Sequence, residues 1–381
     1  MSREVEATLM QLTSANSEAN RKHWALSSKK RGIKVIGTVM PYVPLEIIYA
    51  AGALPWRISG WQSDIGLASA YRPTTSNPYN AQVLELLLRK ELDFLDGAII
   101  SDWDIDTRRL WDDWVGQKWA PPAHIMYVPR HTSPSAYGAM AEEIAKVADF
   151  VETIVGNKIT PEALAGAIST YNEIRTLIRS LYETRKMAEP PLSGAELLGI
   201  TTAALVIPPE DFIQKSKSLL AGLGPRKVPG RQLEPRLLVS SDSLDNPAYL
   251  EMIEETGSLV VMDDTDTGSR CWFGLVEPTL ADPMRSLAER YINFCFGPRT
   301  FSWPQQADQV IAWVKEFNVD GVIELPLSFS HPRAFRAPFF HNCLKRVGIP
   351  SISIARDYRL VNTGQLRTKV QAFLEILGGL G

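Results

Sequence analysis

The stretch "DGVIELPLSFSHPRAF", residues 320–335, decides the predicted fold. Residues 322–327 form a short, mostly apolar run, which is typical of a buried strand. A serine, a histidine and a proline then precede a helical pattern. Ligands of open α/β sheets bind outside the carboxyl ends of such strands, so we expect Ser330 and His331 to lie at a binding site. His331 is either an acid–base group or, as a lone loop histidine, a hydrogen-bonded structural residue.

Strands and helices alternate over most of the chain, which is typical of a parallel sheet covered by helices. Consecutive helical stretches without a strand fill residues 135–220, and a segment rich in Gly, Pro and Arg follows them. The sequence therefore predicts an α/β protein with two parallel-sheet halves, Rossmann- or flavodoxin-like, and a helical layer between them. The expected domains are residues 1–220, which include the helical segment, a linker at 221–235, and residues 236–381.

Composition excludes several classes of protein. The 381 residues carry a net charge of −3, so neither a basic surface for nucleic acid nor an acidic tail is indicated. The sequence has no run of about 18 apolar residues, so we expect no membrane span. The polar N-terminus lacks the apolar core of a signal peptide, so we expect a cytoplasmic protein. Three scattered cysteines are too few for a disulfide framework.

Two more segments carry candidate functional residues. In "PYVPLEIIYAAGALPWRISG", residues 41–60, Glu46 falls in a first helical turn, where a carboxylate suits the helix dipole. Glu46 is either a favourable helix start or a group that faces a cleft. In "SDWDIDTRRLWDDW", residues 101–114, alternate aspartates could bind a cation, but the glycine and distal glutamate of a calcium loop are missing. The acidic stretch at 263–270 is interpreted first as a polar turn at a strand end and second as a ligand loop.

The segment at 41–60 resembles the P-x-E-[LI]-[IL]-x-A-A-G-x-x-P signature of the 2-hydroxyacyl-CoA dehydratase and benzoyl-CoA reductase subunit family. The resemblance continues, in the order of the family, at residues 92–110, 320–335 and 348–377. It implies a subunit of a heterodimeric core. Members typically hold an iron–sulfur cluster through three cysteines on three loops. An ATP-hydrolysing activator supplies one electron, and a ketyl radical then allows acyl-CoA dehydration or reduction of an aromatic ring.

The sequence departs from this family at the three ligand loops. "TTSNPYN", residues 74–80, offers Ser76 or Asn77, and "SDWDID" offers Asp104 or Trp103. The third loop has Ser330 and His331 where the family reads roughly F-C-D-P. None of the three cysteines falls at these positions: Cys271, Cys295 and Cys343. This departure predicts no cluster and no metal on this chain, although Asp104 and His331 could bind another metal if the loops converge. The resemblance implies a [4Fe–4S] cluster on a partner subunit.

These observations give one leading hypothesis and two alternatives. In the leading hypothesis, the chain is a subunit without a cluster. It completes the cleft for an acyl-CoA, or an aryl-CoA, beside a homologous subunit that holds the cluster. An ATP-dependent activator acts on that partner subunit. The catalytic candidates are Glu46, Asp104 and His331, and the substrate-binding candidates are Tyr42, Ser76, Asn77, Trp103 and Ser330. The alternatives are a repurposed acyl-CoA hydratase or lyase without redox chemistry, which would use the same acid–base residues, and a non-catalytic scaffold or binding protein. No nucleic acid or membrane partner is expected.

Overall fold

The chain folds around two four-stranded parallel sheets in the computed structural model, which describes residues 3–60, 65–73, 75–224, 226–228, 235–277, 282–361 and 363–379. The first sheet has the order β2-β1-β3-β4, and the second has the order β6-β5-β7-β8. The predicted α/β class with two parallel-sheet halves is confirmed. The strands are β1 Val35–Val39, β2 Leu54–Arg57, β3 Gly97–Ser101, β4 Ala123–Met126, β5 Arg236–Ser241, β6 Leu259–Thr265, β7 Gly321–Leu325 and β8 Ser351–Ser353.

The central strands are buried along their whole length because helices cover both faces of a parallel sheet. Every residue of β1, β3, β5 and β7 is buried. In the second sheet, Ser240 of β5 lies opposite Asp264 of β6 on one side and Glu324 of β7 on the other. This register sets two carboxylates beside a hydroxyl near the carboxyl ends of three adjacent strands.

The helices of the first half differ in position: α1 packs on α8 and α9, α2 packs on β1 and β2, and α3 to α5 follow strands of the first sheet. Side chains cap two of them: Asn77 accepts a hydrogen bond from the backbone of α4, and Asp104 begins α5 with a capping box. Asn77 and Asp104 belong to the first two of the three segments that correspond to the family's ligand loops, which we call the ligand-like loops. The caps of α4 and α5 therefore hold two of these loops in place. The elements are α1 Arg3–Ser14, α2 Glu18–Lys30, α3 Leu45–Ala50, the 3₁₀ turn η1 Ala68–Ala70, α4 Pro78–Leu88 and α5 Ile105–Gly116.

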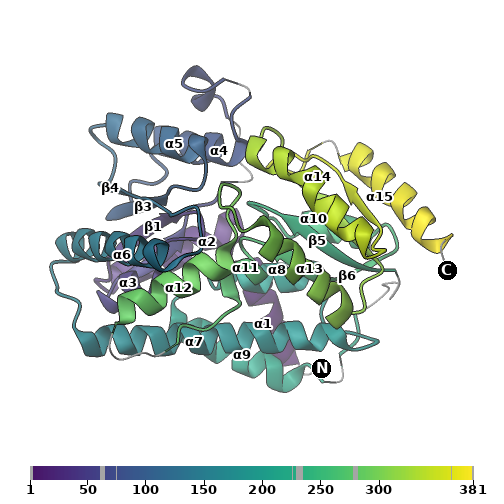
Figure 1. Cartoon of the computed structure of the whole chain (residues 1–381). Coiled ribbons are helices and arrows are strands. Elements are labelled where there is room, and N and C mark those ends of the chain that lie inside the picture. The colour runs from purple at the N-terminus through teal and green to yellow at the C-terminus, as the bar shows by residue number, and fades with distance from the viewer. Residues whose placement is uncertain are drawn as a thin grey trace.

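A helical layer between the halves contacts both sheets. The helix α6 packs on β3 and β4, and α8 packs on β6, with α7 and α9 running below both halves in Figure 1. Its elements are α6 Pro134–Val155, α7 Pro161–Glu183, η2 Thr184–Lys186, α8 Gly194–Ala203 and α9 Pro209–Gly222. The helical layer is thus observed, whereas the division at 221–235 stays a prediction. Residues 225 and 229–234 of that linker lie outside the described residues.

The helices of the second half include the short α11, which begins inside the stretch interpreted as a polar turn. They are α10 Ala248–Glu254, α11 Ser269–Trp272, α12 Pro283–Cys295, α13 Trp303–Glu316, α14 His331–Arg346 and α15 Thr363–Gly378. The helix α14 begins at His331, so this histidine belongs to a helical turn and not to the preceding loop. The prediction of an acidic turn at 263–270 was wrong in part, because β6 continues to Thr265. Asp264 can lie inside a strand because Arg270 pairs with it in the buried interior.

Candidate functional site

A cavity of about 100 Å³ lies where loops of the two halves meet. Its lining includes Ser76 from the loop before α4, Ser328 and Phe329 from the loop between β7 and α14, and Asp357 and Arg359 from the segment after β8. All three segments follow the carboxyl ends of parallel strands, where α/β proteins bind ligands. We call it the strand-end cavity. Residues of the first and third ligand-like loops share its lining, and this contact between the two loops is not evident from the sequence alone.

The second ligand-like loop contacts the first through hydrogen bonds. The side-chain amide of Asn77 donates to Oδ2 of Asp104 over 2.9 Å, and the backbone N–H of Asn77 donates to Oδ2 of Asp106 over 2.9 Å. Asp104 also accepts from the backbone N–H of Thr107 over 2.8 Å as the cap of α5. Burial raises the pKa of the Asp104 carboxyl. All three loops therefore converge, and Asp104 serves as the junction between the first two.

The predicted residues of the third loop, Ser330 and His331, do not line the strand-end cavity, whereas Ser328 and Phe329 directly before them do. Ser330 is buried directly before α14, and its backbone N–H donates to the carbonyl of Leu327 over 3.1 Å. Phe329 adopts the left-handed conformation with φ +65° and stays 43% exposed. His331 is exposed and does not line the cavity. The buried hydroxyl of Ser76 makes no hydrogen bond with the described part of the chain, so it is free for a ligand.

The aromatic candidates Tyr42 and Trp103 pack against each other. Their ring centroids are 5.6 Å apart, and both side chains are buried. The hydroxyl of Tyr42 accepts a hydrogen bond from the backbone N–H of Gly297 over 2.7 Å. Both rings border a small cavity of about 10 Å³ together with Asp102 and Arg299. The structure therefore does not place these two residues in the lining of the strand-end cavity, and their predicted contact with substrate stays a prediction.

Glu46 lies in the first turn of α3, as expected, but in a buried ion pair. Its carboxylate pairs with the Arg175 guanidinium of α7, and the hydroxyl of Tyr291 in α12 donates to it over 2.8 Å. Burial raises the pKa of Glu46, but the positive charges of Arg175 and Arg290 outweigh burial, so this pKa lies below its ordinary value. A carboxylate held in this way joins three helices, and its predicted acid–base role stays a prediction.

Sequence reasoning missed a buried cluster of arginines at the carboxyl end of the second sheet. Arg333 of α14 contacts Asp242 over 3.0 Å and Glu324 over 3.1 Å, and Arg270 of α11 contacts Asp264 over 3.1 Å. The four guanidiniums of the cluster are all buried: Arg270, Arg333, Arg336 and Arg356. One signal was available, because the spacing of three residues between Arg333 and Arg336 puts both on one helical face.

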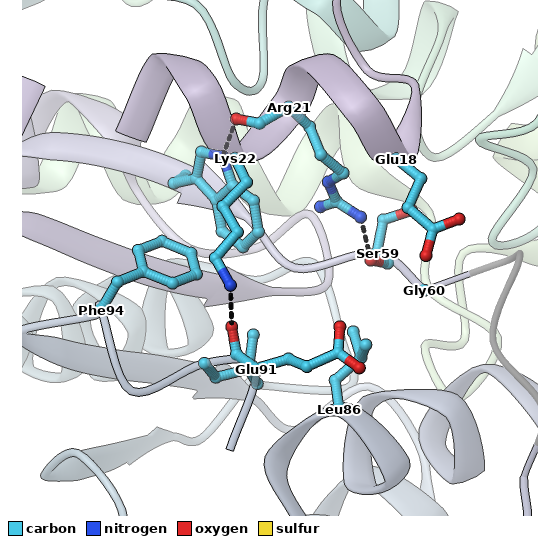
Figure 2. Close-up of a pocket in the computed structure, with 10 residues that line it drawn as sticks. Glu18, Arg21, Lys22, Ser59, Gly60, Leu86, Glu91 and Phe94 are labelled. Carbon is cyan, nitrogen blue, oxygen red and sulfur yellow. Dashed lines mark hydrogen bonds between the residues drawn. The ribbon is translucent and has the colours of Figure 1, made fainter. Parts of the chain in front are cut away.

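A second cavity of about 60 Å³ lies beside the end of β2. Figure 2 shows Arg21 of α2 pointing toward Ser59, and Lys22 pointing toward Glu91. The guanidinium of Arg21 also stacks 4.4 Å from the ring of Trp56. The Nη atoms of Arg21 donate hydrogen bonds to the backbone carbonyls of Ser59 and Arg57. This side chain therefore links α2 to the end of β2.

The residues of the three loops do not fit an iron–sulfur cluster. Such clusters need thiolates, whereas Ser76, Asn77, Asp104 and Ser330 offer hydroxyl, amide and carboxylate groups. The cysteines line no part of the strand-end cavity, and burial raises the pKa of Cys295 to about 12. Within the described ranges, no group of three or more His, Cys, Asp or Glu side chains could hold a metal ion. None of the described helices is long and apolar enough to cross a membrane.

Comparison with known proteins identifies the family. The family model described as "2-hydroxyglutaryl-CoA dehydratase, D-component" matches residues 41–377. This chain belongs to that family. The match begins in the segment around Glu46 and ends in α15, so it includes all three ligand-like loops. The family predicted from the sequence motifs is confirmed.

Curated relatives of this dehydratase-family chain are named as enzyme subunits. It is 25% identical over 369 residues to the (R)-phenyllactyl-CoA dehydratase beta subunit of Clostridium sporogenes, covering 94% of this chain and 96% of the relative. It is 26% identical over 359 residues to a subunit of the benzoyl-CoA reductase of Thauera aromatica, covering 91% and 90%. It is 26% identical over 375 residues to the beta subunit of the (R)-2-hydroxyglutaryl-CoA dehydratase of Acidaminococcus fermentans, covering 94% and 96%.

Proposed function

We propose that this chain is a cluster-free subunit of a heteromeric complex that acts on CoA thioesters. It completes the cleft for an acyl-CoA, including an aryl-CoA, beside a homologous subunit that holds a [4Fe–4S] cluster. The observation that carries the proposal is the convergence of three ligand-like loops that lack a thiol. Ser76 and Phe329 share one cavity, and Asn77 is bonded to Asp104.

The names of the relatives support a complex. They are subunits of dehydratases for (R)-phenyllactyl-CoA and (R)-2-hydroxyglutaryl-CoA and of a reductase for benzoyl-CoA. An activator that hydrolyses ATP would act on the partner subunit, because the loops of this chain offer no thiolates for an electron-accepting cluster. The cytoplasmic location expected from the N-terminus is part of the same proposal.

The strand-end cavity determines what this chain contributes to the cleft. The free hydroxyl of Ser76 provides a hydrogen-bonding group at the substrate, and Phe329 provides an exposed apolar surface. Asp104 holds the start of α5 and the Asn77 side chain in place. In this role the chain binds and orients the thioester, whereas electron transfer belongs to the partner.

The alternative of an independent hydratase or lyase has less support. Such an enzyme would need its acid and its base at one substrate. Glu46 pairs with Arg175 in the interior, and His331 lies exposed outside the lining of the strand-end cavity. A non-catalytic scaffold is the remaining alternative, and thioester binding separates it from the proposal.

The test is co-expression with a homologous subunit that carries the three loop cysteines. We expect the two chains to copurify and to bind (R)-phenyllactyl-CoA. Ser69→Trp, at the wall of the strand-end cavity, should weaken that binding at least tenfold. Ser135→Trp, on the exposed first turn of α6, is the matched control and should leave it unchanged. Failure to copurify, or equal affinity of the two variants, would contradict the proposal. Dehydration by this chain alone would favour the independent enzyme.

A further inference from the structure

A larger cavity, of about 360 Å³, lies outside the strand-end site and is lined by residues of α7, α11, α12 and α13. One face of α7 supplies Arg175, Thr176, Arg179 and Ser180 to its lining. The opposite side is mostly aromatic, with these members: Trp272, Phe273, Phe294, Phe296 and Trp313. An engineered apolar cavity of about 150 Å³ holds benzene, so this cavity has room for a bicyclic ring. We call it the aromatic cavity.

The walls of the aromatic cavity are held rigidly. Phe273 meets Trp313 edge to face at 5.6 Å between ring centroids, and the Arg179 guanidinium lies 4.6 Å from the centre of the Phe273 ring. Glu316 of α13 pairs with Arg179 over 2.6 Å, and both residues belong to the lining. The indole N–H of Trp272 donates to the carbonyl of Thr201 over 3.1 Å. Rigid aromatic walls favour a flat ligand because little side-chain freedom is lost on binding.

Two polar groups of the lining have no partner among the described residues. The Nε–H of Arg175 is buried without a hydrogen bond, although the rest of this guanidinium contacts Glu46 and Asn172. The side-chain amide of Gln309, on α13, makes no hydrogen bond within the described part of the chain either. A buried N–H without a partner is costly, so a ligand that supplies an acceptor gains from it.

The hydrogen-bond donors of the aromatic cavity favour a carboxylate on that ligand. Three guanidiniums line it, from Arg175, Arg179 and Arg270, and Glu316 is the acidic residue of the lining. Carboxylates compensate the charge of each guanidinium: Glu46 pairs with Arg175, Glu183 and Glu316 pair with Arg179, and Asp242 and Asp264 pair with Arg270. What remains for a ligand is the unpartnered Nε–H of Arg175 as a donor. A carboxylate also accepts hydrogen bonds readily from guanidinium and amide N–H groups.

We propose that the aromatic cavity is a second ligand site, which binds a flat, bicyclic aromatic carboxylate between the rings of Phe273 and Trp313 and the face of α7. The carboxylate accepts from Arg175 and Gln309, and the ring system contacts the aromatic wall. This site is separate from the thioester cleft of the proposed function and does not depend on a partner subunit.

The experiment is calorimetric titration of the full chain with 2-naphthoate. We expect saturable binding of one equivalent. Ser180→Trp and Gln309→Trp fill the cavity from opposite sides, and each should weaken binding at least tenfold. Ser169→Trp lies on the exposed surface of α7 outside the lining and should bind like the wild type. Cyclohexanecarboxylate, which has the charge without the flat ring, should bind at least tenfold more weakly than 2-naphthoate.

Three results would overturn this proposal: no saturable binding by the folded wild-type chain, equal binding by the filling variants and Ser169→Trp, or equal binding of the two carboxylates. Circular dichroism and thermal unfolding of each variant show whether it is folded. Two filling variants on different helices keep the comparison decisive if one of them does not fold.

Discussion

Replacement of Glu46 by glutamine separates a structural role for this residue from an acid–base role. Glu46 is fully buried and Arg175 is 2% exposed, so Glu46→Gln leaves an uncompensated cation in the interior. Removal of one partner of a buried pair typically costs about 3–5 kcal/mol of unfolding free energy. Glu210→Gln is the control, because Glu210 is an exposed carboxylate that accepts from Tyr49, and we expect a change within about 0.5 kcal/mol.

Urea unfolding followed by tryptophan fluorescence measures both variants. The double variant Glu46→Gln/Arg175→Met should lose less stability than the two single variants together, because it removes both charges. The pKa of Glu46 is lowered in the folded chain. Its stabilising contribution is therefore complete above the pKa of an unfolded glutamate and is lost as the pH falls through the folded value. The gap between wild type and Glu46→Gln should shrink on acidification. Unchanged stability in Glu46→Gln, with loss of activity in the complex, would refute the structural role.

Three further predictions concern single positions. Asp104→Ala removes the cap of α5 and should cost about 0.5–2 kcal/mol in thermal unfolding, and no cost would contradict the capping role. Gly274→Ala should cost about 1–3 kcal/mol of unfolding free energy, because Gly274 has φ +78° and a Cβ there would meet the ring of Phe294. Gly138→Ala in α6 is the control and should be neutral or stabilising, because a Cβ there meets no atom within 4 Å. Equal effects of the two variants would contradict the packing around Gly274. Burial raises the pKa of Asp266 to about 6, so stability should fall as the pH rises from about 4 to 6, and Asp266→Asn should flatten that fall in a pH series of urea midpoints. An unchanged pH profile would refute the raised pKa.

Local patterns were sufficient to predict the strand and helix order. The short apolar run at residues 322–327 overlaps β7, because a parallel strand between two helical layers needs apolar residues on both faces. The end of β6 was misjudged, since Asp264 is typical of a turn until Arg270 is known to pair with it. Arg270 lies only six residues from Asp264, but the burial that makes the two residues pair arises from the folded chain and leaves no local signal in the sequence.

The candidate site was predicted at the level of loops and not of side chains. The three ligand-like loops come together in the structure, since the carboxyl ends of parallel strands meet at one edge, but their role at a substrate stays a prediction. The partner of Glu46 could not be predicted, because Arg175 lies 129 residues away on a helix with no motif. The aromatic cavity could not be predicted either, because Phe273 and Trp313 contact each other only in the folded chain.

The iron and acid-labile sulfide content of the chain, purified anaerobically, tests the central claim most directly. The chain is measured alone and after co-expression with a homologous subunit that has the three loop cysteines. We predict no stoichiometric iron on this chain alone, and a brown complex that holds a cluster on the partner. Stoichiometric iron and sulfide on this chain alone would contradict the account and would mean that other residues, such as Cys271 or Cys295, hold a cluster.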